Sequence, residues 1–243
     1  MHDNLIILAG GASSRMKREV SSQNLSKEEI DQANERSKAL ISVGPQGRPL
    51  LDYLLFNARQ AGYKNIYLVI SEKGELFKKY YGQKMRDNDF NGLNLSFAVQ
   101  YIPEGREKPF GTADALYQAL EQYPELNSRS YTVCNSDNLY SVEALSILRD
   151  NDSYLHSFIS YDRDALDFPQ EKIARFALVK SDSENKLTDI IEKPPVAQVV
   201  NFKDNKGKLR VSMNIFMFNG TVFHPYIKNC PVNTERNEKE IPT

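Results

Sequence analysis

The stretch LAGGASSRMK, over residues 8–17, places two glycines and an arginine directly after the apolar residues 5–8. Gly10 and Gly11 allow a negatively charged ligand to approach the backbone amides at the end of a strand. The guanidinium of Arg15 can hold phosphate oxygens bidentately. Because the stretch lacks both the P-loop lysine and the third glycine of a dinucleotide-binding loop, it matches neither motif. It predicts a phosphate cradle, with a plain tight turn as the competing interpretation.

Asp137 is the main candidate for catalysis and for binding a metal. It follows the apolar run YTVCN in a short polar turn, NSDN, which is expected at the carboxyl edge of a sheet. A carboxylate there suits Mg²⁺, which takes one or two protein oxygens and completes its shell with phosphate oxygens and water. A turn or helix-capping aspartate is the alternative interpretation.

Other polar residues stand where strands or helices begin or end. In PFGTADAL, Gly111 and Thr112 join a tight turn to a helix start, where they can present backbone and hydroxyl groups to a base or phosphate. Thr112 can also be the N-cap of that helix. Asn214 is a polar residue within the apolar run VSMNIFMF, where it faces a substrate, completes a metal site or satisfies a buried backbone group.

The remaining chemistry-bearing residues indicate no second reaction type. His2, His156 and His224 are scattered and share no metal-ligand spacing. No serine or cysteine has a plausible base nearby in the sequence, which favours a metal-assisted in-line transfer over covalent catalysis. The two cysteines are too few for a disulfide framework and fit a reducing compartment, and Cys134 is expected in the core.

Composition limits the class of protein. The chain has 243 residues, 40% of them hydrophobic, which is enough for one substantial core, so we expect a single domain over residues 1–243. Its formal charge of −1 provides no general attraction to nucleic acid or to a membrane surface. The N-terminus has no secretion-signal pattern and no apolar run could span a bilayer, so we expect a cytoplasmic protein with neither nucleic-acid nor membrane partners.

Short apolar runs alternate with helical periodicity along the chain. This pattern predicts a three-layer α/β/α, Rossmann-like fold with a mixed, mostly parallel central sheet. The helix expected at 50–61 is amphipathic, and Gly62 follows it as a left-handed cap. We expect strands at 5–9, 65–71, 95–101, 131–135, 157–161, 176–180, 187–192 and 211–218, and further helices at 112–122 and 141–150.

A polar insertion is predicted at about residues 17–37, where large apolar side chains are almost absent. Within it, LSKEEI at 25–30 has the pattern of a capping box with a hydrophobic staple, which predicts a short helix from Lys27. The insertion is interpreted either as a solvated surface excursion or as a lid over the phosphate site.

Several motifs together resemble the sugar-phosphate nucleotidyltransferases. LAGG with SSRM, SKAL, PLLDYLL, PEGREKPFGTADAL, NSDNLYS, IIEKP and VSMNIFMF occur in the order and approximate spacing of that family. They extend from the first strand to Phe218. The resemblance implies a nucleoside triphosphate and a sugar-1-phosphate as substrates, Mg²⁺ as cofactor, and an NDP-sugar and pyrophosphate as products.

The resemblance also implies roles for individual residues. Arg15 would contact the triphosphate and the leaving pyrophosphate, and Lys38 would bridge phosphate oxygens near the transferred group. The insertion makes the spacing between these two residues longer than the family's usual one. Gln100 would read the base edge, against which the Gly111 turn lies. Glu192 and Lys193 of IIEKP would bind the sugar hydroxyls and the sugar phosphate.

Two other functions stay open at this point. One is a cytidylyltransferase acting on a non-sugar phosphate such as a polyol phosphate, or a molybdopterin-type transferase, since both share a similar opening loop. The other is a regulatory protein that binds nucleotide without turnover. The chain stops at NEKEIPT where relatives continue, so a shortened C-terminus is expected. The nucleobase, the sugar and whether the protein forms homo-oligomers are not determined by these patterns.

Overall fold

A computed structural model describes residues 1–11, 37–151, 153–174, 176–192 and 195–241. The predicted helix of the insertion lies outside these residues. The strands of the described part are β1 (Asn4–Leu8), β2 (Ser42–Val43), β3 (Arg48–Pro49), β4 (Asn65–Ser71), β5 (Asn88–Phe90), β6 (Leu93–Gln100), β7 (Ser130–Asn135), β8 (His156–Asp162), β9 (Leu178–Ser181), β10 (Leu187–Ile191) and β11 (Arg210–Asn219). The α-helices are α3 (Leu50–Gln60), α4 (Glu75–Tyr81), α5 (Thr112–Gln122), α6 (Val142–Arg149), α7 (Gln170–Ile173) and α8 (Gly220–Lys228).

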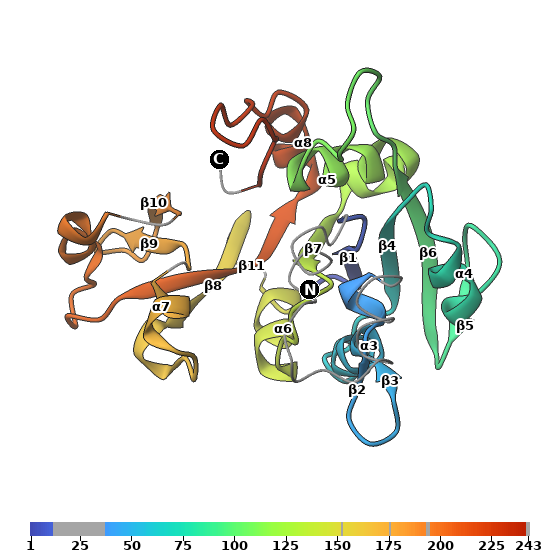
Figure 1. The fold of residues 1–243 in the computed structure, drawn as a ribbon, viewed down its shortest axis with the longest axis horizontal. Helices are drawn as coiled ribbons and strands as arrows, with labels where there is room; N and C mark the ends of the chain where they lie inside the picture. Colours follow the sequence, from blue (N-terminus) through green and yellow to red (C-terminus); the bar gives the residue numbers. More distant parts are fainter. Residues whose placement is uncertain (12–36, 152, 175, 193–194, 242–243) are drawn as a thin grey trace, which may run out of the picture.

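Nine of the described strands form one mixed sheet (Figure 1). Its order is β10-β9-β11-β7-β1-β4-β6-β5, and β8 pairs with β11. The four central strands β7, β1, β4 and β6 are parallel, whereas the flanking strands pair antiparallel. The predicted three-layer fold with a mixed sheet is confirmed, and its parallel pairing is concentrated at the centre.

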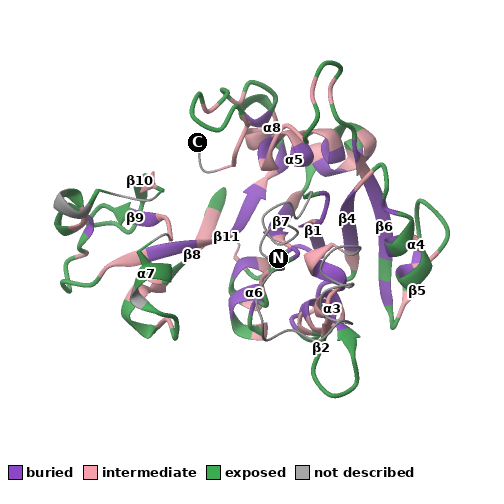
Figure 2. Cartoon of the chain, in the orientation of Figure 1, coloured by how far each residue is buried: buried purple, intermediate pink, exposed green. Residues whose placement is uncertain are grey.

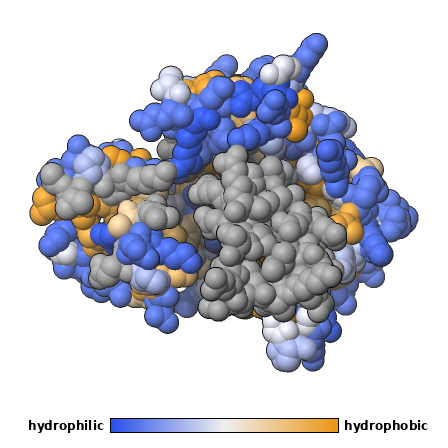
Figure 3. Space-filling view, in the orientation of Figure 1, coloured by the Kyte–Doolittle hydropathy of each residue, from blue (hydrophilic) through white to orange (hydrophobic). Residues whose placement is uncertain are grey.

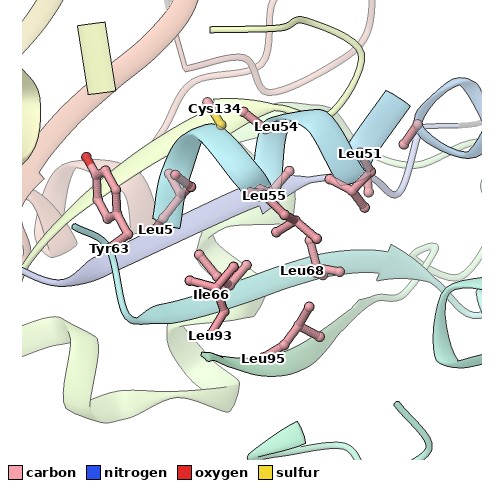
Figure 4. Close-up of a cluster of buried hydrophobic side chains, with 14 of the residues drawn as sticks. Leu5, Leu51, Leu54, Leu55, Tyr63, Ile66, Leu68, Leu93, Leu95 and Cys134 are labelled. Atoms are coloured by element: carbon pink, nitrogen blue, oxygen red, sulfur yellow. The ribbon is translucent and has the colours of Figure 1, made fainter. Parts of the chain in front are cut away.

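Alternating side chains of the central strands build two cores. In β1, Leu5 and Ile7 belong to a cluster that includes α3 and α6, while Ile6 belongs to a second cluster that includes α5 and α8. Successive residues of a strand point to opposite faces, so a strand covered by helices on both faces needs an uninterrupted apolar run. The first cluster is drawn in Figure 4, with α3 lying over β1 and β4.

Helix α3 shows how local sequence sets this packing. Its buried residues recur three and four positions apart and face the sheet: Leu51, Leu54, Leu55 and Ala58. Gly62 follows the helix with a φ of +92°, a conformation that favours glycine and confirms the predicted left-handed cap. The helix therefore begins and ends close to the predicted residues.

Several short helices and strands have no clear hydrophobic period in the sequence and were not predicted. Helix α4 has seven residues and β5 has three, too few to show a clear period. Helix α8 contains Pro225, which argues locally against a helix. It is held instead by packing, because its Ile227 is buried in the second cluster.

Beyond β11, the sheet continues into a less buried extension formed by β8, β9, β10 and α7 (Figure 2). A small third cluster of Leu178, Phe202 and Val211 packs there. Strand β10 is largely exposed, in contrast to the central strands. No helix in the described part of the chain is long and apolar enough to cross a membrane.

Candidate functional site

A cleft of about 380 Å³ opens where the parallel strands β1, β6 and β7 end. Open α/β sheets bind ligands at this carboxyl edge. The cleft is lined by most of the residues selected from the sequence: Gly10, Gly11, Lys38, Gln100, Gly111, Thr112, Asp137, Glu192 and Asn214. Arg15 and Lys193 lie outside the described residues. The fold thus gathers the described candidates around one cleft, while their roles stay predictions.

Lys38 and Asp137 form an ion pair within the cleft. The Lys38 Nζ lies 3.1 Å from the Asp137 Oδ2, although the two residues are far apart in the sequence. Lys38 begins a 3-10 turn that is anchored by the buried side chains of Ala39 and Leu40. The two charged side chains are 44% and 36% exposed, so an entering phosphate or cation can reach both. Their arrangement presents a cation and a carboxylate together at the end of β7.

The backbone around Asp137 is tied to β1. The amide of Ser136 donates to the carbonyl of Leu8 at 3.1 Å, which extends the β1–β7 contact past the strand ends. This bond holds the Asp137 turn next to the Gly10–Gly11 loop. Cys134, just before the turn, also borders the cleft, but burial raises the pKa of its thiol and keeps it protonated. It is a core residue, as expected, and a poor nucleophile.

Gln100 is buried at the end of β6. Its Nε2 donates to the carbonyl of Gly111 and to the Asp114 carboxylate, both at 3.0 Å. A Cβ at position 10 would lie 3.0 Å from the Gln100 Oε1, so glycine lets the first loop approach this side chain closely. Both amide hydrogens of Gln100 are thus used within the protein. A base read by Gln100 would meet its Oε1 or displace one of these bonds.

The structure corrects the interpretation of Thr112 as an N-cap. Helix α5 begins at Thr112, and Gly111 is its N-cap, with a φ of +106°. The Thr112 hydroxyl instead accepts a hydrogen bond from the amide of Ile241 at 3.1 Å. A Cβ on Gly111 would lie 2.2 Å from the Lys239 carbonyl oxygen. The turn therefore packs against a second segment of backbone.

That second segment, residues 233–241, forms one wall of the cleft and was not selected from the sequence. The amide of Lys239 donates to the Phe110 carbonyl at 2.7 Å, and its carbonyl accepts from the amide of Ala113 at 2.9 Å. We call residues 233–241 the C-terminal wall. Because these bonds join residues more than a hundred positions apart, no local pattern could have indicated them.

Arg236 is the central charged residue of the C-terminal wall. Its guanidinium donates to the carboxylate of Glu192 and, at 2.6 Å, to that of Glu240. All three residues line the cleft. The pair with Glu192 connects the C-terminal wall to the end of β10, and the pair with Glu240 lies within the wall. Lys108 and Glu238 also border the cleft and were likewise missed.

The oxygen ligands that the cleft offers fit a magnesium ion that is held jointly by the protein and by a bound nucleotide. Within the described ranges, no three His, Cys, Asp or Glu side chains cluster as a closed metal site. Asp137 offers a partly exposed carboxylate beside the loop predicted to hold phosphate. Mg²⁺ is commonly held by one or two carboxylates together with substrate phosphates, so this arrangement fits it when a nucleotide is bound.

Comparisons with known proteins find a matching family model, related sequences and a related fold. A family model described as nucleotidyl transferase matches residues 4–242. A glucose-1-phosphate adenylyltransferase of Paraburkholderia phymatum is 22% identical over 226 residues, which are 92% of this chain and 49% of that protein. The chloroplastic/amyloplastic small subunit of the enzyme of the same name from Triticum aestivum is 26% identical over 202 residues, covering 80% of this chain and 38% of the relative.

The chain spans about half the length, or less, of these curated relatives. Among solved structures, UDP-glucose pyrophosphorylase complexed with UDP-glucose aligns with a TM-score of 0.69 at 12% identity. The alignment covers 100% of this chain and 84% of that chain. At this identity the similarity shows a common fold.

Proposed function

The chain belongs to the nucleotidyl transferase family, and on this premise we propose that it joins a nucleoside triphosphate to a sugar-1-phosphate. The observation that carries the proposal is the Lys38–Asp137 pair, set beside the Gly10–Gly11 loop at the carboxyl ends of β1 and β7. The names of the three similar proteins support a sugar phosphate over a polyol phosphate as substrate, because each name refers to a glucose derivative.

In this reaction an oxygen of the sugar phosphate attacks the α-phosphorus of the triphosphate. The bond from that phosphorus to the oxygen bridging to the β-phosphate breaks, and pyrophosphate leaves with the bonding electrons. The step brings many negative charges together, so positioning and charge neutralisation supply most of the catalysis. Lys38 would neutralise phosphate charge near the transferred group, and the glycine loop would let phosphates approach backbone amides.

Asp137 would hold Mg²⁺, which neutralises triphosphate charge and polarises the phosphoryl oxygens when bound. Gln100 and the Gly111 turn would lie on the base side of the cleft, and Glu192 with Asn214 on the sugar side. We carry Arg15 and Lys193 forward as phosphate ligands on their sequence motifs alone.

A pyrophosphate-release assay tests the proposal. ATP, UTP, CTP, GTP and dTTP are each combined with several sugar-1-phosphates and with a polyol phosphate, in the presence of Mg²⁺. Lys38→Ala should abolish most release, while Lys64→Ala, at an exposed lysine paired with Asp3, should leave it unchanged. Release with the polyol phosphate alone would favour the cytidylyltransferase alternative. Nucleotide binding without release from any pair would indicate a regulatory protein.

A further inference from the structure

Two residues of the cleft, Asp137 and Asn214, stand on irregular backbone. Asp137 is in the turn after β7, and Asn214 is in a bulge of β11, where the register with β8 shifts between Ser212 and Phe216. Asn214 has a φ of +55°, a left-handed conformation that is uncommon for residues with a Cβ. Such backbone persists only where surrounding contacts hold it. The structure should therefore contain contacts that hold the backbone at Asn214.

The hydroxyl of Tyr140 is placed to do this. It donates to the carbonyls of Met213 and Asn214, with oxygen–oxygen distances of 2.8 and 3.1 Å. It accepts from the Asn138 Nδ2 at 3.1 Å and from the Asn135 amide at 3.4 Å. One hydroxyl thus contacts the residues on either side of the Asp137 turn and two carbonyls of the bulge.

These contacts use the full capacity of a hydroxyl group, which has one hydrogen and two acceptor lone pairs. The two carbonyls share the hydrogen, and Asn138 adds a second donor to Met213, at 3.1 Å. Tyr140 is 2% exposed, and burial raises its pKa well above the usual value, so the group stays protonated. In this buried setting the bonds face little competition from water.

Tyr140 is itself held from two directions. Its ring belongs to the core cluster under α3, and its carbonyl accepts a hydrogen bond from the Asn57 side chain of α3 at 2.8 Å. The hydroxyl is therefore a fixed point rather than a flexible contact. If the hydroxyl were removed, the turn and the bulge would keep the Asn138–Met213 bond and the β7–β11 pairing, but would lose the four hydrogen bonds that meet at the hydroxyl.

We propose that Tyr140 is a positioning residue, whose hydroxyl sets the Asp137 turn and the Asn214 bulge at a fixed separation for the transfer reaction. This inference rests on the proposed function. It differs from a purely structural role because small displacements of reacting groups lower turnover much more than they lower substrate binding.

The experiment compares two variants that each lose one buried hydroxyl. Tyr140→Phe removes the hydroxyl and its hydrogen bonds, and Tyr123→Phe is the matched control. The Tyr123 hydroxyl also donates to two carbonyls, those of Met85 and Phe97, at 3.1 and 2.7 Å, and it lies at the far end of α5 from the cleft. Melting temperature, kcat, and KM for both substrates are measured for the wild type and the two variants.

Both variants should melt at similarly reduced temperatures, because each leaves buried carbonyls short of a donor. Only Tyr140→Phe should lower kcat, by about 10- to 100-fold, with little change in either KM. Equal kcat values in the two variants would overturn the inference and leave Tyr140 as an ordinary core residue. A wild type without pyrophosphate release would instead refute the proposed function.

A second variant decides the matter if Tyr140→Phe does not fold. Asn138→Ala removes two bonds of the network from a half-buried turn and leaves the Tyr140 ring in the core. Its kcat should fall in the same selective way, by a smaller factor than for Tyr140→Phe, while its melting temperature changes little. An unchanged kcat in a folded Asn138→Ala protein would count against the link.

Discussion

The two walls of the cleft are held by different kinds of interaction. The wall that carries Asp137 and Asn214 is fixed by a buried hydroxyl with all of its hydrogen bonds made. The C-terminal wall is joined to the start of α5 by hydrogen bonds of its backbone, but its connection to the end of β10 is the ion pair of Arg236 with Glu192, whose side chains are 34% and 37% exposed. Residues 233–241 are mostly hydrophilic, and blue, hydrophilic residues predominate at the top of the space-filling view (Figure 3).

The difference predicts different mechanical behaviour. Buried hydrogen bonds act in a low dielectric and are little affected by dissolved salt, whereas exposed ion pairs are weak and screened. The first wall is therefore suited to hold reacting groups in one geometry. The C-terminal wall is suited to adjust, except where its backbone touches Gly111. Substitutions in the first wall should therefore mainly change turnover, whereas substitutions in the C-terminal wall should mainly change the stability of the fold and its dependence on salt.

The largest effect is expected at Asp137. Asp137→Asn should lower turnover by orders of magnitude, because it removes the negative charge that would hold the metal. Its melting temperature should stay close to the wild-type value, since the side chain is partly exposed and at a strand end. Pyrophosphate release and thermal melts measure both. An early-melting variant whose folded fraction turns over normally would show that Asp137 is structural.

The next effect concerns the backbone contact of the C-terminal wall. Gly92→Ala, with a φ of +82° and open space around it, should lose about 1–2 kcal/mol of stability. Gly111→Ala has a larger backbone cost, because φ +106° with ψ −177° is open essentially to glycine alone, and it also places a Cβ 2.2 Å from the Lys239 carbonyl oxygen. It should lose a further ~1–3 kcal/mol. Denaturant melts compare the pair, and equal losses would mean that the wall moves aside freely.

A pH effect is expected at the amino edge of the parallel strands, at the other end of β1 and β7 from the cleft, where buried His2 contacts Thr132 of β7. Burial lowers the pKa of His2 from 6.5 to about 4. Between pH 6.5 and pH 4, His2 is protonated in the unfolded chain but neutral in the folded protein. The free energy of unfolding therefore falls as the pH drops from about 6.5 to 4, and His2 does not affect it above that range. The loss should reach roughly 3 kcal/mol.

Denaturant melts between pH 7.5 and pH 4 should show this decline in the wild type. His2→Asn keeps a polar side chain that does not titrate, so its stability should vary less over the same interval. Identical pH dependence in the two proteins would show that another group is responsible.

The smallest effect is expected for the exposed ion pairs. Glu192→Gln, which breaks the exposed pair with Arg236 and leaves the Arg236–Glu240 pair in place, should lower stability by less than about 1 kcal/mol, and this loss should shrink in high salt. Lys186→Gln, which breaks an exposed pair with Glu184 away from the cleft, is the control for general surface charge. Melting temperatures in low and high salt test this. A large, salt-independent loss in Glu192→Gln would mean that the C-terminal wall is as rigid as the first wall.

The central fold could be predicted because its signals are local. Continuous apolar runs predicted the buried parallel strands, and the periods of α3 and α5 indicated their bounds to within a residue. Elements stabilised mainly by contacts, such as α8 with its internal Pro225, carried no such signal. Threonine is a common N-cap residue, so Thr112 was a reasonable prediction. The helix, however, begins at Thr112, and the N-cap is Gly111, whose positive φ favours glycine.

The sequence by itself determined which residues can carry chemistry and that Asp137 follows a buried strand. Only the tertiary structure brought Lys38 to within 3.1 Å of Asp137, laid residues 233–241 against Gly111, and linked the Asn214 bulge to Tyr140. The physical reason is range. Periodicity and turn chemistry act over a few residues, whereas these contacts join segments 74 to 129 positions apart, which come together when the sheet and its two cores assemble.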